Sequence, residues 1–267
     1  MMIEEVHLWR GTPAERALRS QLVKISQFAY FHEQLDEPDW TGKLVLDFGG
    51  NKGNLLLDPS CAIQQRDYYC VDVVSEAIEE GRRTFPEAHW FHYDRYNRSF
   101  NPEGIRDLKI PDLERQFDFI LAYSVFTHTT LEELRELVSQ LETFLAPGGA
   151  LAFTFIDPHW RGNLQWRLER SQAPDVAGLV AAAAGADWCS LINGTELYVN
   201  SNGPWDLSPE TCATYNVFYT ERFLRQLFPR ARVQPPVSGE MQHCAILRTD
   251  ALYKTSESGE LNAESVR

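Results

Sequence analysis

The sequence predicts an α/β fold built on a doubly wound, mostly parallel sheet, and three observations lead to it. Short apolar runs alternate with helical patterns through the middle of the chain, as strands and crossover helices do. The first run ends in an acid, Asp47, followed by a glycine-rich turn. The second run ends in another acid, Asp72, nineteen residues after the last glycine of that turn, Gly53. The 267 residues, 43% of them hydrophobic, suffice for one such domain with a sizeable elaboration.

The first strand and its turn occupy residues 44–53, with the sequence LVLDFGGNKG. Three apolar residues lead to Asp47, and glycines at 49, 50 and 53 follow. A glycine turn after a strand lets a polar ligand approach the backbone N–H groups closely. The second run, residues 68–71, ends in Asp72, where a strand-turn-helix-strand unit places an acid against a ribose diol. Together they predict a nucleoside cofactor.

The turn does not match the dinucleotide fingerprint G-x-G-x-x-G, because Asn51 and Asn54 occupy two of the glycine positions. This argues against a nicotinamide cofactor. The pattern from Asp47 to Gly53 is D-x-G-x-x-x-G, which resembles the first motif of the class I S-adenosylmethionine-dependent methyltransferases, D-x-G-x-G-x-G. Asn51 replaces the middle glycine, and asparagine also visits left-handed backbone geometry.

Helices are predicted from caps and apolar spacing. Residues 12–15 form a capping box that starts a helix extending to about residue 35, either docked on the core or acting as a lid over the cofactor pocket. Asp58-Pro59 interrupts the first crossover helix, because proline is not tolerated in a helix interior. Ser75 is expected to cap the helix at residues 75–83, and Thr130 a helix that runs to about residue 145. Pro147-Gly148-Gly149 is expected to end that helix.

The remaining elements follow the same alternation. The predicted third, fourth and fifth strands cover residues 90–93, 117–123 and 150–156, a last helix covers 219–228, and a final strand covers 244–248. Residues 97–116 form a long irregular connection and a possible pocket wall.

Two later segments strengthen the resemblance. FDFILAYSVFTH (117–128) and LETFLAPGGALAFTF (141–155) look like the fourth and fifth motifs of the small-molecule class I methyltransferases. The resemblance covers residues 42–157 and 217–248. It implies a Rossmann-like, seven-stranded sheet that is mostly parallel, with an antiparallel last strand.

The chain then divides into four parts. Residues 1–40 form the N-terminal helical lid, 41–157 with 217–250 the cofactor-binding domain, 158–216 a cap insertion, and 251–267 a disordered tail. Asn193-Gly194 predicts a hairpin within the insertion, whose tryptophans either form the acceptor pocket or pack a small core of their own.

The resemblance also implies residue roles. Asp47 and the backbone of Gly49, Gly50, Asn51 and Gly53 should hold the amino-acid end of S-adenosylmethionine, and Asp72 the ribose hydroxyls. The remaining cofactor contacts are Val73 and Asp94 at the adenine and Tyr123 and Ser124 at the sulfonium.

A general base is needed only for an acceptor that loses a proton. His159, just after Asp157-Pro158, is the preferred base by position. His128 is a second candidate, for which a structural role beside the Thr130 cap is favoured over catalysis. Asp157 and the lid residues Tyr30 and His32 are further base candidates, and Tyr30, Phe31, Asp157 and Trp160 are expected to contact the acceptor.

Composition narrows the partners. The net charge of −13 argues against a nucleic-acid substrate, and five cysteines without a C-x-x-C pair fit reduced, buried thiols rather than a metal site. No signal peptide or long apolar run is visible, so a cytoplasmic protein without a membrane partner, possibly a homodimer, is expected.

The leading hypothesis is an enzyme that methylates an oxygen or nitrogen of a small aromatic or apolar metabolite, with S-adenosylhomocysteine as product. The alternatives are a non-catalytic S-adenosylmethionine-binding protein, or an enzyme that uses the same fold for a reaction other than methyl transfer.

Overall fold

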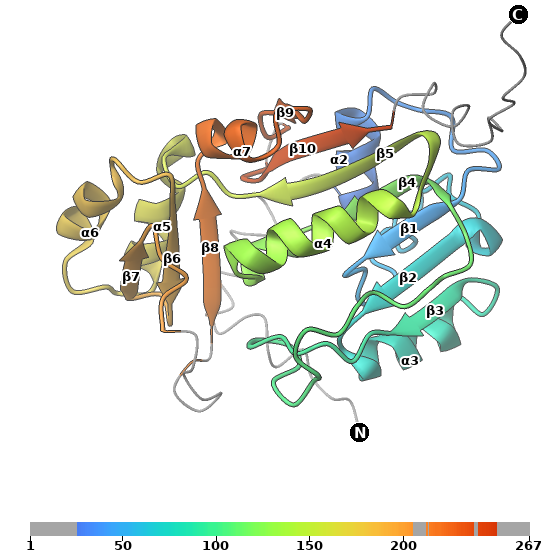
Figure 1. Ribbon diagram of the computed structural model, residues 1–267, viewed down its shortest axis with the longest axis horizontal. Coiled ribbons are helices and arrows are strands. Elements are labelled where there is room, and N and C mark those ends of the chain that lie inside the picture. Colours follow the sequence, from blue (N-terminus) through green and yellow to red (C-terminus); the bar gives the residue numbers. More distant parts are fainter. Residues whose placement is uncertain (1–25, 205–211, 213, 238–239, 250–267) are drawn as a thin grey trace, which may run out of the picture.

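The computed structural model describes residues 26–204, 212, 214–237 and 240–249. Its centre is a seven-stranded sheet with the strand order β3-β2-β1-β4-β5-β10-β9 (Figure 1). Strands β1 to β5 are parallel, whereas β10 is antiparallel to both of its neighbours, β5 and β9. The predicted sheet, mostly parallel with an antiparallel last strand, is therefore confirmed. The strands are β1 (Val45–Phe48), β2 (Tyr68–Asp72), β3 (His89–His92), β4 (Phe117–Ala122), β5 (Leu145–Phe155), β9 (Arg232–Gln234) and β10 (His243–Arg248).

Side chains alternate between the two faces of this sheet, as successive residues of a strand must. Leu46 of β1 and Ile120 of β4 belong to the core under helix α4 (Leu131–Thr143), while Val45 and Phe119 belong to the core under α2 (Gln27–Gln34) and α3 (Ser75–Thr84). Figure 1 shows α4 running across one face of the sheet, with α2 behind it. Both faces are thus buried, which explains the nearly continuous apolar strands.

The first crossover has no α-helix, as the Asp58-Pro59 break predicts. Residues 51–60 form consecutive turns, and a short 3₁₀ segment, η1 (Gln65–Asp67), leads into β2. The next helix, α3, begins at Ser75, so the prediction that Ser75 is its N-cap is wrong by one residue. Val74 occupies the cap position, and its backbone N–H donates to the Asp72 carboxylate at 2.8 Å.

Helix α4 begins with the predicted capping box between Thr130 and Glu133. It ends at Thr143, before the Pro147-Gly148-Gly149 turn that was expected to stop it. That turn lies inside β5, because Leu145 already pairs with Phe117 of β4 and the register then shifts before Phe119. The glycine turn is therefore a strand irregularity and not a helix cap.

The insertion forms a second sheet. Its strands are β6 (Trp188–Ile192), β7 (Glu196–Val199) and β8 (Tyr215–Tyr219), in the order β7-β6-β8, beside the short segment η3 (Trp160–Gly162) and the helices α5 (Asn163–Arg170) and α6 (Val176–Ala183). Asn193 and Gly194 both have positive φ and form the predicted hairpin between β6 and β7. Tyr219 ends β8, so helix α7 (Glu221–Leu227) begins later than predicted, capped by the Thr220 side chain.

The insertion shares a core with the main sheet. Trp188 of β6 and Tyr215, Val217 and Tyr219 of β8 are buried in the same cluster as the α4 leucines. The expected boundary between residues 216 and 217 falls inside β8, so the insertion is continuous with the main domain through this strand.

Parts of the predicted ends lie outside the described residues, namely the capping box at residues 12–15, the first half of the lid, and the tail. Within the described part, α2 has its own start, because the Ser26 hydroxyl accepts a hydrogen bond from the Ala29 N–H at 3.0 Å. Among the described helices, none is long and apolar enough to cross a membrane.

Candidate functional site

The turn after β1 is a tightly packed backbone cradle. Gly49 has a φ of 75°, and a Cβ added there would lie 2.4 Å from a methyl group of Val125. Asn51 follows with a φ of 54°, the left-handed conformation that the sequence anticipated for this asparagine. The turn after β1 therefore packs closely against the segment that follows β4, with no side chain at Gly49 between them.

Asp72, at the end of β2, binds this turn to the next helix. One carboxylate oxygen accepts the Asn51 N–H at 2.7 Å and the other accepts the Val74 N–H at 2.8 Å. The side chain is only 6% exposed, and burial raises its pKa while the backbone donors oppose the rise. Each oxygen keeps a further lone pair, so the carboxylate can still accept hydrogen bonds from a ligand.

Asp47 lies beneath the turn rather than beside the cleft. It is buried, accepts a hydrogen bond from the Tyr68 hydroxyl at 2.6 Å, and leaves no room for a Cβ at Gly50. Burial raises the pKa of Asp47 to about 7. The sequence placed Asp47 at the ligand, but the structure makes it a support for the turn.

A cleft with about 960 Å³ of empty space, part of it open to solvent, runs along the carboxyl ends of the parallel strands. Seven of the residues predicted from the sequence line it: Gly49, Asn51, Asp72, Val73, Tyr123, Ser124 and His128. Asp47, Gly50, Gly53 and Asp94 are not among the lining residues.

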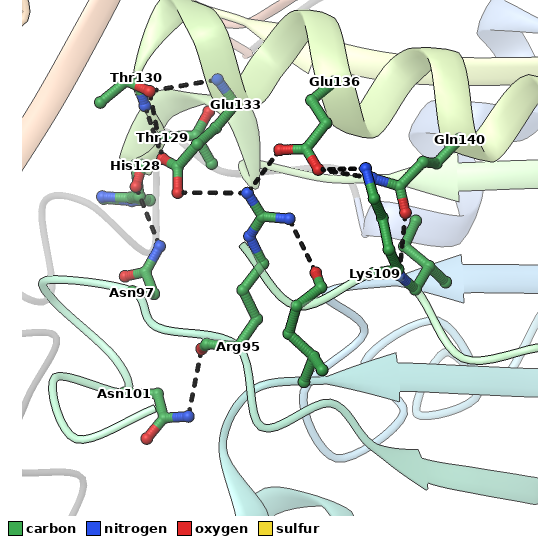
Figure 2. A network of polar contacts seen from close by, with 12 residues as sticks. Arg95, Asn97, Asn101, Lys109, His128, Thr129, Thr130, Glu133, Glu136 and Gln140 are labelled. Atoms are coloured by element: carbon green, nitrogen blue, oxygen red, sulfur yellow. Dashed lines mark hydrogen bonds and ion pairs between the residues drawn. The ribbon is translucent and has the colours of Figure 1, made fainter. Parts of the chain in front are cut away.

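The connection after β3 supplies a wall of the cleft, and the part from Asn97 onward belongs to the irregular segment 97–116, which the sequence indicated as a possible pocket wall. Tyr93, Arg95, Tyr96, Asn97 and Phe100 all line the cleft. Figure 2 shows Arg95 reaching α4, where its guanidinium lies 2.7 Å from Glu136 and 3.8 Å from Glu133. This buried ion pair fixes the wall against α4, and no motif in the sequence pairs these residues.

Asp94 does not face the cleft. It is exposed, and its carboxylate accepts a hydrogen bond from Asn101 at 3.0 Å within its own loop. The structure therefore gives no support to its expected contact with the adenine, whereas the neighbouring Arg95 is buried and lines the cleft.

His128 lies at the cleft, whereas the preferred base His159 does not. The Nδ1 of His128 is 2.8 Å from the Tyr215 carbonyl, so it carries the proton and donates, and burial lowers the pKa to about 4. Its backbone carbonyl accepts a hydrogen bond from Asn97 (Figure 2). His159 is exposed and outside the cleft lining, so its position after β5 does not bring it to the site.

The other expected acceptor contacts have structural partners. Asp157 accepts the N–H groups of His159 and Glu221, both at 2.8 Å, and so links η3 to the start of α7. Trp160 packs edge-on against His243, with ring centroids 5.0 Å apart. Among the described residues, none from the insertion lines the cleft.

The aromatic residues of α2 are core residues. Tyr30 and Phe31 are fully buried and pack edge-on against Tyr123, with ring centroids 5.5 and 6.1 Å away. His32 accepts a hydrogen bond from Trp40 at 3.1 Å. Of the described α2 residues, only Gln27 reaches the cleft lining, so α2 supports the site mainly from behind Tyr123.

The fold and the cleft define the class of the protein, a Rossmann-like domain of the class I methyltransferase type with its site at the carboxyl ends of the strands. Residues 46–151 match the family model described as a methyltransferase domain. The recognition made from the sequence motifs is confirmed.

One solved structure agrees with this chain at the level of the fold. A S-adenosylmethionine-dependent methyltransferase from Clostridium acetobutylicum ATCC 824 superposes with a TM-score of 0.50 at 11% identity, covering 89% of this chain and 98% of that one. The glycopeptide N-methyltransferase MtfA complexed with S-adenosyl-L-methionine gives a TM-score of 0.49 at 10% identity, with 84% and 94% covered.

Proposed function

We propose that this protein transfers a methyl group from S-adenosylmethionine to an oxygen or nitrogen of a small acceptor. The observation that carries the proposal is the Asp72 carboxylate, which lines the cleft beside the left-handed turn at Gly49 and Asn51. A carboxylate next to a bare backbone turn is suited to a nucleoside, because it can accept hydrogen bonds from two adjacent hydroxyl groups.

The cleft residues fit this cofactor one by one. Asp72 would hold the ribose, Val73 would pack against the adenine, and the Gly49–Asn51 backbone would admit the amino-acid end. Tyr123 and Ser124 would lie at the sulfonium. Ser124 has a φ of 59°, and strain of this kind at a strand end is typical of functional sites.

When bound, S-adenosylmethionine supplies a methyl group that is already activated on sulfur, so the protein mainly aligns the acceptor. The cleft offers Phe100 and His128, whose rings pack edge-on with centroids 5.0 Å apart. We assign His128 to orienting the acceptor, because its low pKa keeps it neutral at neutral pH. The aromatic wall and the net charge of −13 support a small aromatic or apolar metabolite rather than a nucleic acid.

Calorimetric titration with S-adenosylmethionine and S-adenosylhomocysteine tests the proposal. We expect wild-type protein to bind both ligands and Asp72→Ala to lose at least about 1.5 kcal/mol of binding free energy, through lost hydrogen bonds to the ribose. Asp94→Ala is the matched control and should bind like wild type, since Asp94 contacts only its own loop. Failure of folded wild-type protein to bind either ligand would overturn the proposal.

A further inference from the structure

A buried carboxylate lies directly behind the wall of the cleft. Glu240 belongs to the loop before β10, and because β10 is antiparallel to β5 this loop reaches the carboxyl end of β5. Tyr123 comes directly after β4, at the same edge of the sheet, and lines the cleft. Its hydroxyl donates a hydrogen bond to Glu240 Oε2 at 2.9 Å. The topology thus joins a cleft residue to an acid that is distant in the sequence.

The charge of Glu240 is poorly compensated. The residue is 7% exposed, and its second oxygen, Oε1, is buried without a hydrogen-bond partner. From the described part of the chain, its carboxylate receives only the Tyr123 hydroxyl and a long contact of 3.4 Å from the Met241 N–H. Burying a carboxylate without a cation or a full set of hydrogen-bond donors costs stability, so the presence of Glu240 at this place points to a function.

The surroundings of Glu240 hold it in place. The Ser124 N–H donates to Thr154 Oγ1, and Thr154 in turn donates to Gln242 Oε1, both at 2.7 Å. The Tyr30 hydroxyl donates to the Gln242 carbonyl at 3.0 Å. These bonds tie the end of β4, β5 and α2 to Gln242, two residues after Glu240, and so hold the loop that carries Glu240 beside Tyr123.

Three neutral groups lie on the described elements around Glu240, and the charge of Arg232 from β9 acts on one of them, Cys244. They are Tyr30 from α2, Tyr123 after β4 and Cys244 from β10, and burial raises the pKa of all three, so they are neutral at neutral pH. Burial also raises the pKa of Glu240, against the lowering effect of the Tyr123 hydrogen bond. A cation in the cleft near Tyr123 would compensate the charge of Glu240.

We propose that Glu240 and Tyr123 form a proton-accepting pair that serves an acceptor whose nitrogen or oxygen loses a proton on methylation, such as an amine, a phenol or a carboxylic acid. This inference rests on the proposed function and narrows its substrate class. Tyr123 contacts the acceptor, and Glu240 is a positioning residue that acts through it.

The step balances in atoms and charge. The N–H or O–H bond of the acceptor breaks, and its electron pair remains on the nitrogen or oxygen that takes the methyl group. The proton passes to Tyr123 Oη, while the proton of Tyr123 passes to Glu240 Oε2. The carbon–sulfur bond breaks with its electron pair left on sulfur, so the positive sulfonium and the negative carboxylate are neutralised together.

The test requires no knowledge of the acceptor. S-adenosylmethionine carries a positive sulfonium that S-adenosylhomocysteine lacks, and a positive charge near Glu240 favours its ionised form. Titrations of both ligands in buffers with different ionisation enthalpies, between about pH 5 and 8, measure the protons released on binding. We expect wild type to release a fraction of a proton with S-adenosylmethionine and none with S-adenosylhomocysteine.

In Glu240→Gln the release should disappear, and the preference for S-adenosylmethionine over S-adenosylhomocysteine should fall about 3- to 10-fold. Glu142→Gln, at the far end of α4, is the matched control and should behave as wild type. Tyr123→Phe provides a second variant, in which Glu240 loses its donor and proton release should increase.

The outcomes separate the two proposals. If folded wild-type protein binds neither ligand, the proposed function fails. If both ligands bind but Glu240→Gln and Tyr123→Phe release protons and discriminate between the ligands as wild type does, the pair is structural and the inference is overturned. With any acceptor that is turned over, Glu240→Gln should lower kcat by a larger factor than it raises the KM for S-adenosylmethionine, and Glu240→Asp should restore part of kcat.

Discussion

At Gly49, the backbone conformation and the packing both exclude a side chain. Its φ is 75°, and an added Cβ would lie 2.4 Å from Val125. We expect Gly49→Ala to lower the free energy of unfolding by about 1–3 kcal/mol and to weaken S-adenosylhomocysteine binding at least about 10-fold, because the turn must move. Denaturant unfolding and calorimetry measure the two effects.

Gly148→Ala is the control for Gly49→Ala. It has a similar φ of 80° but nothing within 4 Å of an added Cβ. It should cost about 1 kcal/mol of stability and leave binding intact. Equal effects of the two substitutions on binding would show that the close approach at Gly49 is unimportant.

The buried Asp47 makes the stability depend on pH. Its pKa rises from 3.8 to about 7 in the folded protein, so the folded state holds a proton that the unfolded state has lost between these values. Stability from this group is therefore present at low pH and is lost as pH rises toward 7. Asp47→Asn should remove this loss, so its stability relative to wild type should increase between about pH 4 and 8, by a few kcal/mol at most.

Denaturant unfolding across this pH range measures the difference. Asp94→Asn, in an exposed loop, is the control and should leave the pH dependence unchanged. A constant difference between Asp47→Asn and wild type at all pH values would mean that Asp47 is ionised in the folded protein.

The sequence located some site residues better than others. Asp72 and the turn were predictable, because the spacing of strand ends in a parallel sheet fixes which groups meet at its edge. The direction in which a side chain points was not predictable from this spacing. Asp94 bonds within its own loop, while Arg95 beside it lines the cleft. Glu240 was missed because its partner Tyr123 is 117 residues away, and no local pattern records that contact.

Among the elements, α4 carries one wall of the cleft and depends on its cap. The Thr130 hydroxyl accepts the Glu133 N–H at 3.1 Å, and the Glu133 carboxylate accepts the Thr130 N–H at 2.9 Å. Thr130→Ala should cost about 1 kcal/mol of stability, because it leaves a helix N–H group without its acceptor. Denaturant unfolding measures this cost.

Thr143→Ala is the matched control on the same helix. Thr143 is exposed near the other end and bonds only the Gln140 carbonyl, so its substitution should stay within about 0.5 kcal/mol of wild type. A similar cost for both substitutions would argue against the cap as the source of the Thr130 effect.

Element types followed from sequence patterns more reliably than their ends. The capping box at Thr130 was identified because both of its hydrogen bonds are local in sequence. The expected stop at Pro147-Gly148-Gly149 was wrong because pairing of Leu145 with Phe117, a tertiary contact, recruits the segment into β5. The assignment of Tyr219 to a helix was wrong for the same reason: its pairing with Trp188, also a tertiary contact, makes it a strand residue.

For the whole molecule, the shared core predicts a single unfolding transition. Trp188 and Tyr219 of the insertion are buried with Leu134 and Leu137 of α4, so the insertion cannot unfold without exposing the main core. Far-ultraviolet circular dichroism and tryptophan fluorescence should therefore give coincident urea transitions. Two separated midpoints would show that the insertion is an independent unit.

The most direct test of the proposed cofactor site is a crystal structure of the protein with S-adenosylhomocysteine. We expect both ribose hydroxyls to lie about 2.5–3.0 Å from the Asp72 carboxylate oxygens, with the adenine against Val73 and the sulfur facing Tyr123. Binding in which the ribose makes no contact with Asp72, or binding outside the cleft, would contradict the assignment of the site.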